Sequence, residues 1–428
     1  MRTFLRALAA LIAVLLVPGV SAAVSVTSTF GAFHAPGPER AVPAAAPIQH
    51  DPAKPTAVVL VGELGAVISD VLVPYEILAS TGRFNVYTVA ARRVLLPLTG
   101  GLDLVPDLTF DDPLARTPDL VVVPALPDVG QPSTAPITDW LRVQSARGAQ
   151  MLTVCNGAGV LASAGLLDGR RATAHWLRLN RFEANYPKVN WVRGARYVDD
   201  GTLVSTGGIL SSVDGTLHMI ERLAGPAVAA NAAAAVRWRH YRAGPPVSSG
   251  LALPDVVAIF NGGYRWSPST VGVLLTNGVG EIELASVFEP HSQSLAARTL
   301  ALSTDGGPVR SRHGLTFVPR GDVAGAAPRL DRLLVPGSAR IAPVPGAPAP
   351  EYVHDGGFAF DATLRDLARN IDVATARWTA KVLELPTNGL VLEGPAWPWG
   401  PTLLPFALIL LGVAVVAVVR KRPFLAKR

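Results

Sequence analysis

The sequence predicts an α/β domain whose parallel sheet is covered by helices on both faces. Short apolar runs, typical of strands buried on both faces, occur at 57–61, 84–90, 120–123 and 151–154. Between them, 70–80 and 137–147 space their apolar residues as amphipathic helices do. Strands that alternate with helices join through crossover connections, which makes the neighbouring strands parallel.

The single cysteine follows the fourth of these strands. Cys155 is succeeded by Asn156-Gly-Ala-Gly159 and by an apolar, helix-like run from Val160 to Leu167. A sharp strand-to-helix turn exposes a nucleophile at the sheet edge where ligands bind. The helix N-terminus is expected to lower the thiol pKa. The alternative is a small buried apolar residue, which is the usual role of a lone cysteine.

The segment from Cys155 to Trp176 resembles the elbow-to-histidine region of the ThiJ/PfpI superfamily, whose members are class I glutamine amidotransferase-like proteins. It is most similar to the sensory half of AraC-type regulators and to isocyanide hydratases. Residues 70–78, 197–208 and 213–218 extend the resemblance over one domain, from about Thr56 to Arg242. The resemblance implies a flavodoxin-like fold.

The resemblance also implies a catalytic site. Asp70 matches a carboxylate that family members place beside the sulfur, where it could share a proton; the alternative is a helix N-cap. His175 matches a histidine expected to be the general base or an orienting group, with a structural histidine as the alternative. Backbone N–H groups of Asn156, Ala125 and Leu126 are the expected oxyanion donors. Ala125 and Leu126 stand where the family commonly has paired glycines, so close approach is harder there.

Both chain ends predict membrane targeting. Residues 1–22 have the basic start, apolar centre and small-residue end of a signal peptide, with an uncleaved signal anchor as the alternative. Residues 23–54, rich in Ala and Pro, are expected to be a linker. The uncharged segment 401–419 is long enough to span a bilayer, and the basic tail 420–428 is expected to stay in the cytoplasm. This predicts a single-pass protein of the cell membrane with an extracytoplasmic body.

Composition excludes several classes of function. One cysteine excludes an intramolecular disulfide. The net charge of +6 arises partly at the two ends, and no basic stripe with interleaved aromatic residues predicts nucleic-acid binding. No motif predicts a cofactor or a metal ion.

The chain also contains an internal similarity. Leu120–Pro124 matches Arg332–Pro336 at an offset of 212 residues, and Asp214–Leu217 matches Asp361–Leu364 at 147, so 65 residues are missing from the later copy. The missing residues include the elbow and His175. We therefore expect a ThiJ/PfpI-like domain at 55–245 and a degenerate repeat without the elbow at 253–385. The repeat is expected to act as an internal partner in a pseudo-dimer, or the chain to form a homodimer.

Details of this repeat are also expected from the sequence. Its first strand and helix are predicted at Asp255–Gly278, and a Pro/Ala linker at Ala339–Glu351 in place of the lost segment. Short sequence matches place Glu76–Ser80 opposite Ile282–Ser286, and Val236–Trp238 opposite Ala376–Trp378.

Three functions remain open. The first is a cysteine-dependent hydrolase, hydratase or lyase acting on a small electrophile through Cys155, Asp70 and His175. The second is a non-catalytic ligand- or redox-sensing domain without a DNA-binding domain. The third is an extracytoplasmic interaction platform. A small-molecule substrate or ligand is expected for the first two, and the sequence identifies none.

Overall fold

Seven strands form the central sheet of the first unit, which comprises residues 56–241. The computed structural model describes residues 2–45, 47–241 and 250–421. The strands lie in the order β10 (Tyr197–Asp200), β11 (Leu203–Thr206), β7 (Gln150–Thr153), β6 (Leu120–Val123), β1 (Thr56–Leu60), β2 (Asn85–Ala90) and β5 (Leu108–Thr109). Neighbouring strands are parallel except β10 and β11, which are antiparallel. The predicted parallel α/β domain is therefore present, and its central strands are buried along their whole length.

Helices cover both faces of this sheet. On one face, three helices pack together: α2 (Ile68–Ser80), α6 (Ser211–Ala224) and α7 (Pro226–Ala235). On the other lie α3 (Ala135–Ala146) and α4 (Gly157–Ser163). Smaller elements complete the unit: β3 (Leu96–Leu98), β4 (Leu102–Val105), β8 (Arg171–Ala172), α5 (Leu179–Asn185) and β9 (Asn190–Trp191).

A second, smaller domain follows, here called the second unit (residues 269–385). Its parallel sheet has the order β13 (Ala297–Leu302), β12 (Ser269–Leu274), β16 (Arg332–Val335) and β17 (Pro350–Tyr352). The other elements are α9 (Glu281–Gln293), β14 (Val309–Arg310), β15 (Thr316–Val318), α10 (Val323–Ala326), α11 (Ala359–Asn370) and α12 (Val373–Val382). Across this sheet the strands that come second, first, third and fourth in the sequence follow one another. The strands β2, β1, β6 and β7 of the first unit have the same arrangement.

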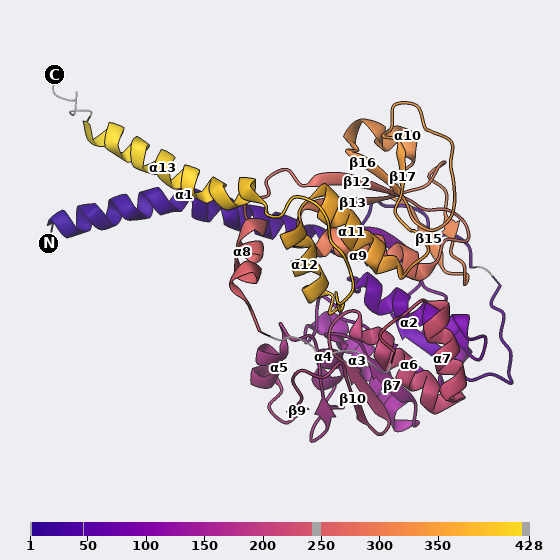
Figure 1. Cartoon of the computed structure of the whole chain (residues 1–428). Helices are drawn as coiled ribbons and strands as arrows, with labels where there is room; N and C mark the ends of the chain where they lie inside the picture. Colours follow the sequence, from indigo (N-terminus) through magenta and orange to yellow (C-terminus); the bar gives the residue numbers. More distant parts are fainter. Residues whose placement is uncertain (1, 46, 242–249, 422–428) are drawn as a thin grey trace.

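The two units meet through α2 and α9, which lie side by side (Figure 1). Each helix presents a glutamate to the first turn of the other. Glu76 of α2 accepts a hydrogen bond from the Ile282 N–H at 2.5 Å, and Glu289 of α9 accepts one from the Ser69 N–H at 3.4 Å. Both contacts stabilise a helix N-terminus, where N–H groups lack helical partners.

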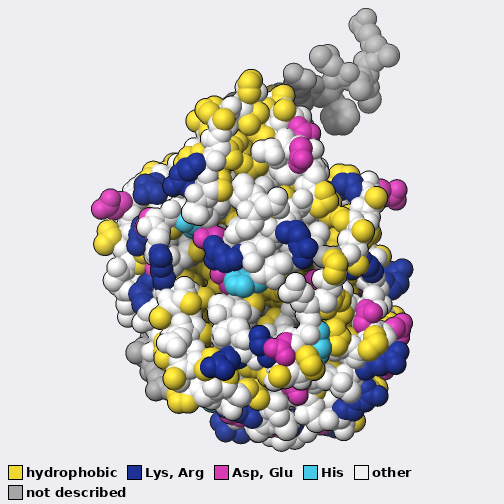
Figure 2. Space-filling view, turned by 90° about the vertical axis from the view of Figure 1, so that its right-hand side faces the viewer, with side chains coloured by type: hydrophobic (Ala, Val, Ile, Leu, Met, Phe, Trp, Pro, Cys, Tyr) yellow, Lys and Arg dark blue, Asp and Glu magenta, His cyan; other side chains and the backbone are white. Residues whose placement is uncertain are grey.

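A second contact joins the hairpins of the two units into one sheet. Strand β4 pairs with β15 in antiparallel orientation, giving the order β14-β15-β4-β3. On the face that Figure 2 presents, acidic and basic side chains are interspersed.

Two apolar helices extend from the body together (Figure 1): α1 (Arg2–Ala32) and α13 (Trp399–Lys421). The parts long and apolar enough to cross a membrane are Ala10–Thr29 and Trp399–Val418. The helices touch at Gly412, where an added Cβ would lie 3.2 Å from the backbone of Val14. Helix α8 (Leu253–Gly262) packs beside both.

Four expectations about element positions are wrong. The linker 23–54 begins as helix, because α1 continues to Ala32 before the prolines at 36 and 38. Helix α4 stops at Ser163 rather than reaching Leu167, since Gly165 has a φ of +75°. Residues 255–278 contain α8 and then β12, so the first strand and helix of the second unit are β12 and α9. The expected linker 339–351 ends inside β17.

Two sequence expectations extend beyond the described residues. They are the domain boundary at residue 245 and most of the basic tail, residues 422–428.

Candidate active site

Cys155 lies at the turn between β7 and α4, at the carboxyl end of the parallel strands. Its φ is 55°, in the left-handed region that non-glycine residues rarely occupy. Gly157 makes the turn possible, because a Cβ there would lie 2.0 Å from the carbonyl oxygen of Val123. The structure therefore has the sharp strand-to-helix geometry expected at this position.

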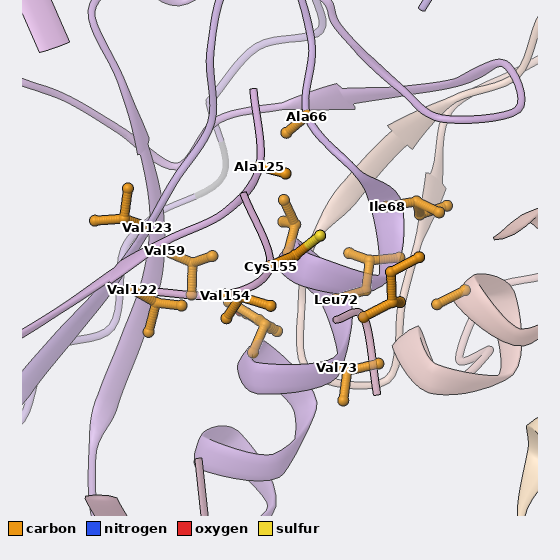
Figure 3. Packing of buried hydrophobic residues seen from close by; sticks show 14 of the residues in the cluster. Val59, Ala66, Ile68, Leu72, Val73, Val122, Val123, Ala125, Val154 and Cys155 are labelled. Carbon is orange, nitrogen blue, oxygen red and sulfur yellow. The ribbon is translucent and has the colours of Figure 1, made fainter. Parts of the chain in front are cut away.

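The sulfur lies in apolar surroundings. Figure 3 shows it directed toward the start of α2, among Ala66, Ile68, Leu72 and Ala125. Cys155 is only 3% exposed. Burial, followed by the nearby carboxyls of Asp70 and Glu384, raises the pKa of the Cys155 thiol well above its usual value, although the Asn156 N–H donates to the sulfur.

The expected lowering of the thiol pKa is thus wrong. Helix α4 has seven residues, and the field at its N-terminus does not offset the loss of water around the sulfur. At neutral pH, Cys155 carries its proton.

Asp70 lies on the first turn of α2 and is completely buried. Its Oδ2 accepts a hydrogen bond from the Ala125 N–H at 2.9 Å, whereas its Oδ1 has no partner. Burial raises the pKa of Asp70 well above its usual value, which favours the protonated carboxylic acid. The N-cap of α2 is Val67, so the helix-cap interpretation of Asp70 is wrong.

His175 is held by backbone groups at both ring nitrogens. Nε2 lies 2.8 Å from the carbonyl oxygen of Val382, in the second unit, and Nδ1 accepts from the Leu177 N–H at 3.2 Å. Burial lowers the pKa of His175 to about 4, so the ring is neutral, and it stacks on Trp176. The general-base role stays a prediction; in this geometry the ring fixes the contact between the units.

Of the expected oxyanion donors, two already have partners within the site. The Ala125 N–H donates to Asp70, and the Asn156 N–H donates to the sulfur. Leu126 is buried with its side chain against Gly62, where an added Cβ would lie 3.0 Å from it.

Two further carboxyl groups near the sulfur were not expected from the sequence. Glu384 and Glu289, both of the second unit, contribute to the raised pKa of Cys155 and of Asp70. Burial raises the pKa of each glutamate to about 7. No local motif marks Glu384, because its partner Ser211 lies 173 residues earlier.

Two surface cavities lie away from the sulfur. One, of about 560 Å³, is lined by residues 36–42 together with Leu95 and Asp103, and the other, of about 260 Å³, lies beside Glu63 and Arg92. Cys155 lines neither of them, which agrees with its burial.

Comparison with known proteins identifies the first unit. The model of the DJ-1/PfpI family matches residues 56–222. Isonitrile hydratase of Pseudomonas putida is 33% identical over 184 residues, which cover 42% of this chain and 76% of the hydratase. The chain belongs to the DJ-1/PfpI family. The superfamily resemblance read from the elbow segment is therefore confirmed.

Regulators also match the DJ-1/PfpI domain, but over a smaller part of their length. The HTH-type transcriptional regulator CdhR of Pseudomonas aeruginosa is 36% identical over 96 residues, 22% of this chain and 28% of the regulator. Among solved structures, a THiJ/PfpI family protein from Pseudomonas syringae is 25% identical, with a TM-score of 0.40 over 46% of this chain and 82% of that one.

One cluster of metal-ligating residue types lies outside the DJ-1/PfpI site. Side-chain atoms of Glu76, Glu281 and His313 lie within 4.8 Å of one another at the contact between the units. Arg312 donates to Glu76 at 3.2 Å, and His313 Nδ1 lies 2.8 Å from Glu281. These contacts account for the cluster as an ion-pair network that joins α2 to the β14–β15 turn.

Proposed function

We propose that the DJ-1/PfpI domain is a cysteine-dependent hydratase for a small, neutral electrophile such as an isonitrile. The observation that carries this proposal is the burial of Cys155 and Asp70 in one site, which raises the pKa of both groups well above their usual values. A dry apolar site suits an uncharged substrate. The similarity to an isonitrile hydratase over three quarters of that enzyme supports the choice of substrate.

The chemistry requires only these two side chains and one molecule of water. The Cys155 sulfur bonds to the isonitrile carbon while Asp70 donates its proton to that carbon and takes the thiol proton at its other oxygen. The product is a thioimidate. Water then adds across the C=N bond, its oxygen bonding to the carbon and one of its protons going to the nitrogen. The C–S bond breaks, the hydroxyl proton passes to the sulfur, and an N-substituted formamide leaves. One water is consumed and the site returns to its starting state.

The test uses the full-length protein in detergent with tert-butyl isonitrile, and N-tert-butylformamide is measured by NMR. Cys155→Ser should abolish turnover, and Asp70→Asn should lower kcat by about 10²–10⁴-fold. His218→Ala, which removes a partly exposed ring whose Nε2 lies 2.7 Å from Asp199, should match wild type. Equal formamide production by the Cys155→Ser variant would refute the proposal.

The alternative is a ligand-sensing domain without turnover. The observation that favours it is the use of the Ala125 N–H by Asp70, which leaves that donor unavailable to a substrate oxygen. Saturable binding of the isonitrile, measured calorimetrically without formamide formation, would establish sensing instead. The raised thiol pKa disfavours a redox sensor, because oxidation proceeds through the thiolate.

We also propose that the second unit is a degenerate copy of the first, docked as an internal pseudo-dimer partner. Equal strand order and the reciprocal glutamate contacts of α2 and α9 support this. The two contacts have equivalent members: the donors Ser69 and Ile282 are 213 residues apart, and so are the acceptors Glu76 and Glu289. A monomeric chain in detergent is expected by light scattering, whereas a homodimer built on α2 would contradict it.

The membrane topology completes the proposal. We place α13 across the membrane with the body on the extracytoplasmic side, which the basic residues after Val419 support. The contact of Gly412 with Val14 favours the signal-anchor alternative, in which α1 is retained.

Two measurements test this topology. Alkaline phosphatase should be active when fused after Glu393 and silent when fused after Arg428. The intact mass of the purified protein should include residues 1–22 if α1 is retained. An active fusion after Arg428 would place the tail outside and overturn the assignment.

A further inference from the structure

Glu384 reaches the Cys155 site from the second unit. It follows the end of α12 by two residues and has a φ of 53°, in the left-handed region. Its neighbours are fixed by the first unit: the Leu210 N–H donates to Leu383 O at 2.9 Å, and His175 bonds to Val382 O at 2.8 Å. A non-glycine residue keeps this backbone conformation only where its surroundings hold it there.

The first unit provides a fitted place for the carboxyl group. Ser211 Oγ donates to Glu384 Oε2, and the N–H groups of Gly208 and Trp176 face the carboxyl. A Cβ on Gly207 or on Gly208 would lie 2.6 Å from atoms of this carboxyl group. Both positions must therefore be glycine for Glu384 to enter.

One carboxyl oxygen is left without a partner. Glu384 Oε1 is buried and makes no hydrogen bond, although Oε2 is bonded. Buried polar atoms are nearly always bonded, so this unpaired oxygen is unusual. Glu384 acts electrostatically on both Cys155 and Asp70.

The charge of Glu384 changes near neutral pH. Burial raises its pKa to about 7, while Ser211 and Arg196 oppose that rise. The other titratable groups facing the site are Glu289, with a pKa of about 7, and His175, which is neutral. A carboxylate at Glu384 disfavours a thiolate at Cys155 because the charges are alike.

We propose, building on the hydratase function proposed above, that Glu384 is a positioning residue of the Cys155 site, and that its charge controls when the thiol ionises. The second unit then does more than cover α2. It supplies a carboxyl group that titrates near neutral pH, whereas His175 of the first unit is already neutral there.

The test follows alkylation of Cys155, the only cysteine, by iodoacetamide from pH 5.5 to 9 in the full-length protein in detergent. Glu384→Gln keeps the shape of the side chain but removes its charge. The ratio of its labelling rate to the wild-type rate should be near one below pH 6. Above pH 8 it should reach about threefold to tenfold, the effect of removing one nearby like charge. Glu183→Gln, which loses a carboxylate bonded to Arg193 on the surface, should match wild type throughout.

Two outcomes would overturn the inference. A Glu384→Gln ratio that is raised equally at every pH would mean that the residue only packs the site closed. A ratio of one throughout would mean that its charge does not reach the sulfur. Failure of the proposed reaction is separate, because it would show as absent formamide in the wild type while the labelling ratio still changed with pH.

Discussion

The two units place different chemistry at corresponding positions of their sheets. Cys155 follows β7 by two residues, and His354 follows β17 by two. The third residue of the adjoining helix is Asp70 in one unit and Glu283 in the other. Ala125 follows β6 by two residues, and Gly337 follows β16 of the second unit by two.

The hydrogen bonds at these positions differ. The Ala125 N–H donates to Asp70, whereas the Gly337 N–H donates to His354 Nδ1 at 2.8 Å. His354 Nε2 lies 2.9 Å from Ser286 Oγ, and Glu283 bonds to Arg312. The site at Cys155 thus leaves one oxygen of Asp70 and one of Glu384 unpaired in a buried interior, while the one at His354 satisfies its polar groups and is partly exposed. The comparison teaches that one strand edge can hold a buried thiol on a left-handed backbone or a histidine with both ring nitrogens bonded, depending on whether the elbow is present.

The largest expected effect concerns the aromatic residues that join the units. Phe288 of α9 packs against the β3–β4 turn at Gly100, and Tyr75 of α2 donates to His313 O in the β14–β15 turn. Phe288→Ala should lower the free energy of unfolding by about 3–5 kcal/mol, since it removes a fully buried ring. Both units should unfold in one transition, monitored by circular dichroism in urea. Two transitions, with that of the first unit unchanged, would mean that the units are independently stable.

The sequence alone could predict the first unit because its signals are local. Buried strands, the glycines after Cys155 and the acidic residue at position 70 all lie within short segments. Glu384 and Glu289 could not be identified, because their relation to Cys155 depends on how the second unit docks.

The register of the internal similarity was predicted only in part. The offset of 212 residues agrees with β6 and β16, and that of 147 with the starts of α7 and α12. The match of Glu76 with Ile282 is wrong, because Glu76 lies late in α2 and Ile282 begins α9. Likewise Trp238 does not correspond to Trp378: it follows α7, whereas Trp378 lies inside α12. Short sequence segments rich in Ala recur by chance, whereas the contacts between the units determine how their residues align.

The expected effect of intermediate size is on stability at high pH, and it should differ between Glu76 and Glu289. Burial raises the pKa of Glu76 and of Glu289 to about 7, yet only Glu76 has an arginine, Arg312, at 3.2 Å. The folded state holds these protons above the ordinary glutamate pKa, so each group costs stability as pH rises from about 4.5 to 7. Glu289→Gln should therefore stabilise the protein at pH 8 by on the order of 1–3 kcal/mol, and not at pH 4.5.

The Glu76→Gln variant tests whether the contacts of Glu76 and Glu289 differ in the way that the structure shows. Glu76→Gln should gain less at pH 8, because it also removes the ion pair with Arg312. Unfolding in urea at both pH values provides the comparison. Equal gains for the two variants would mean that Arg312 does not compensate the charge of Glu76.

The smallest expected effect is at His354, the counterpart of Cys155 by position. His354→Ala removes bonds to Gly337 and Ser286 and should cost about 1–2 kcal/mol at pH 7, the usual loss for such hydrogen bonds. Burial lowers the pKa of His354, so the unfolded state binds the proton more readily and the histidine's contribution falls as pH drops below about 6.5. The loss caused by the variant should therefore shrink at pH 5, while the rate of Cys155 alkylation at pH 7 stays at the wild-type value. A change in that rate would show that the two positions are coupled, and that the second unit's site does more than hold its own strands together.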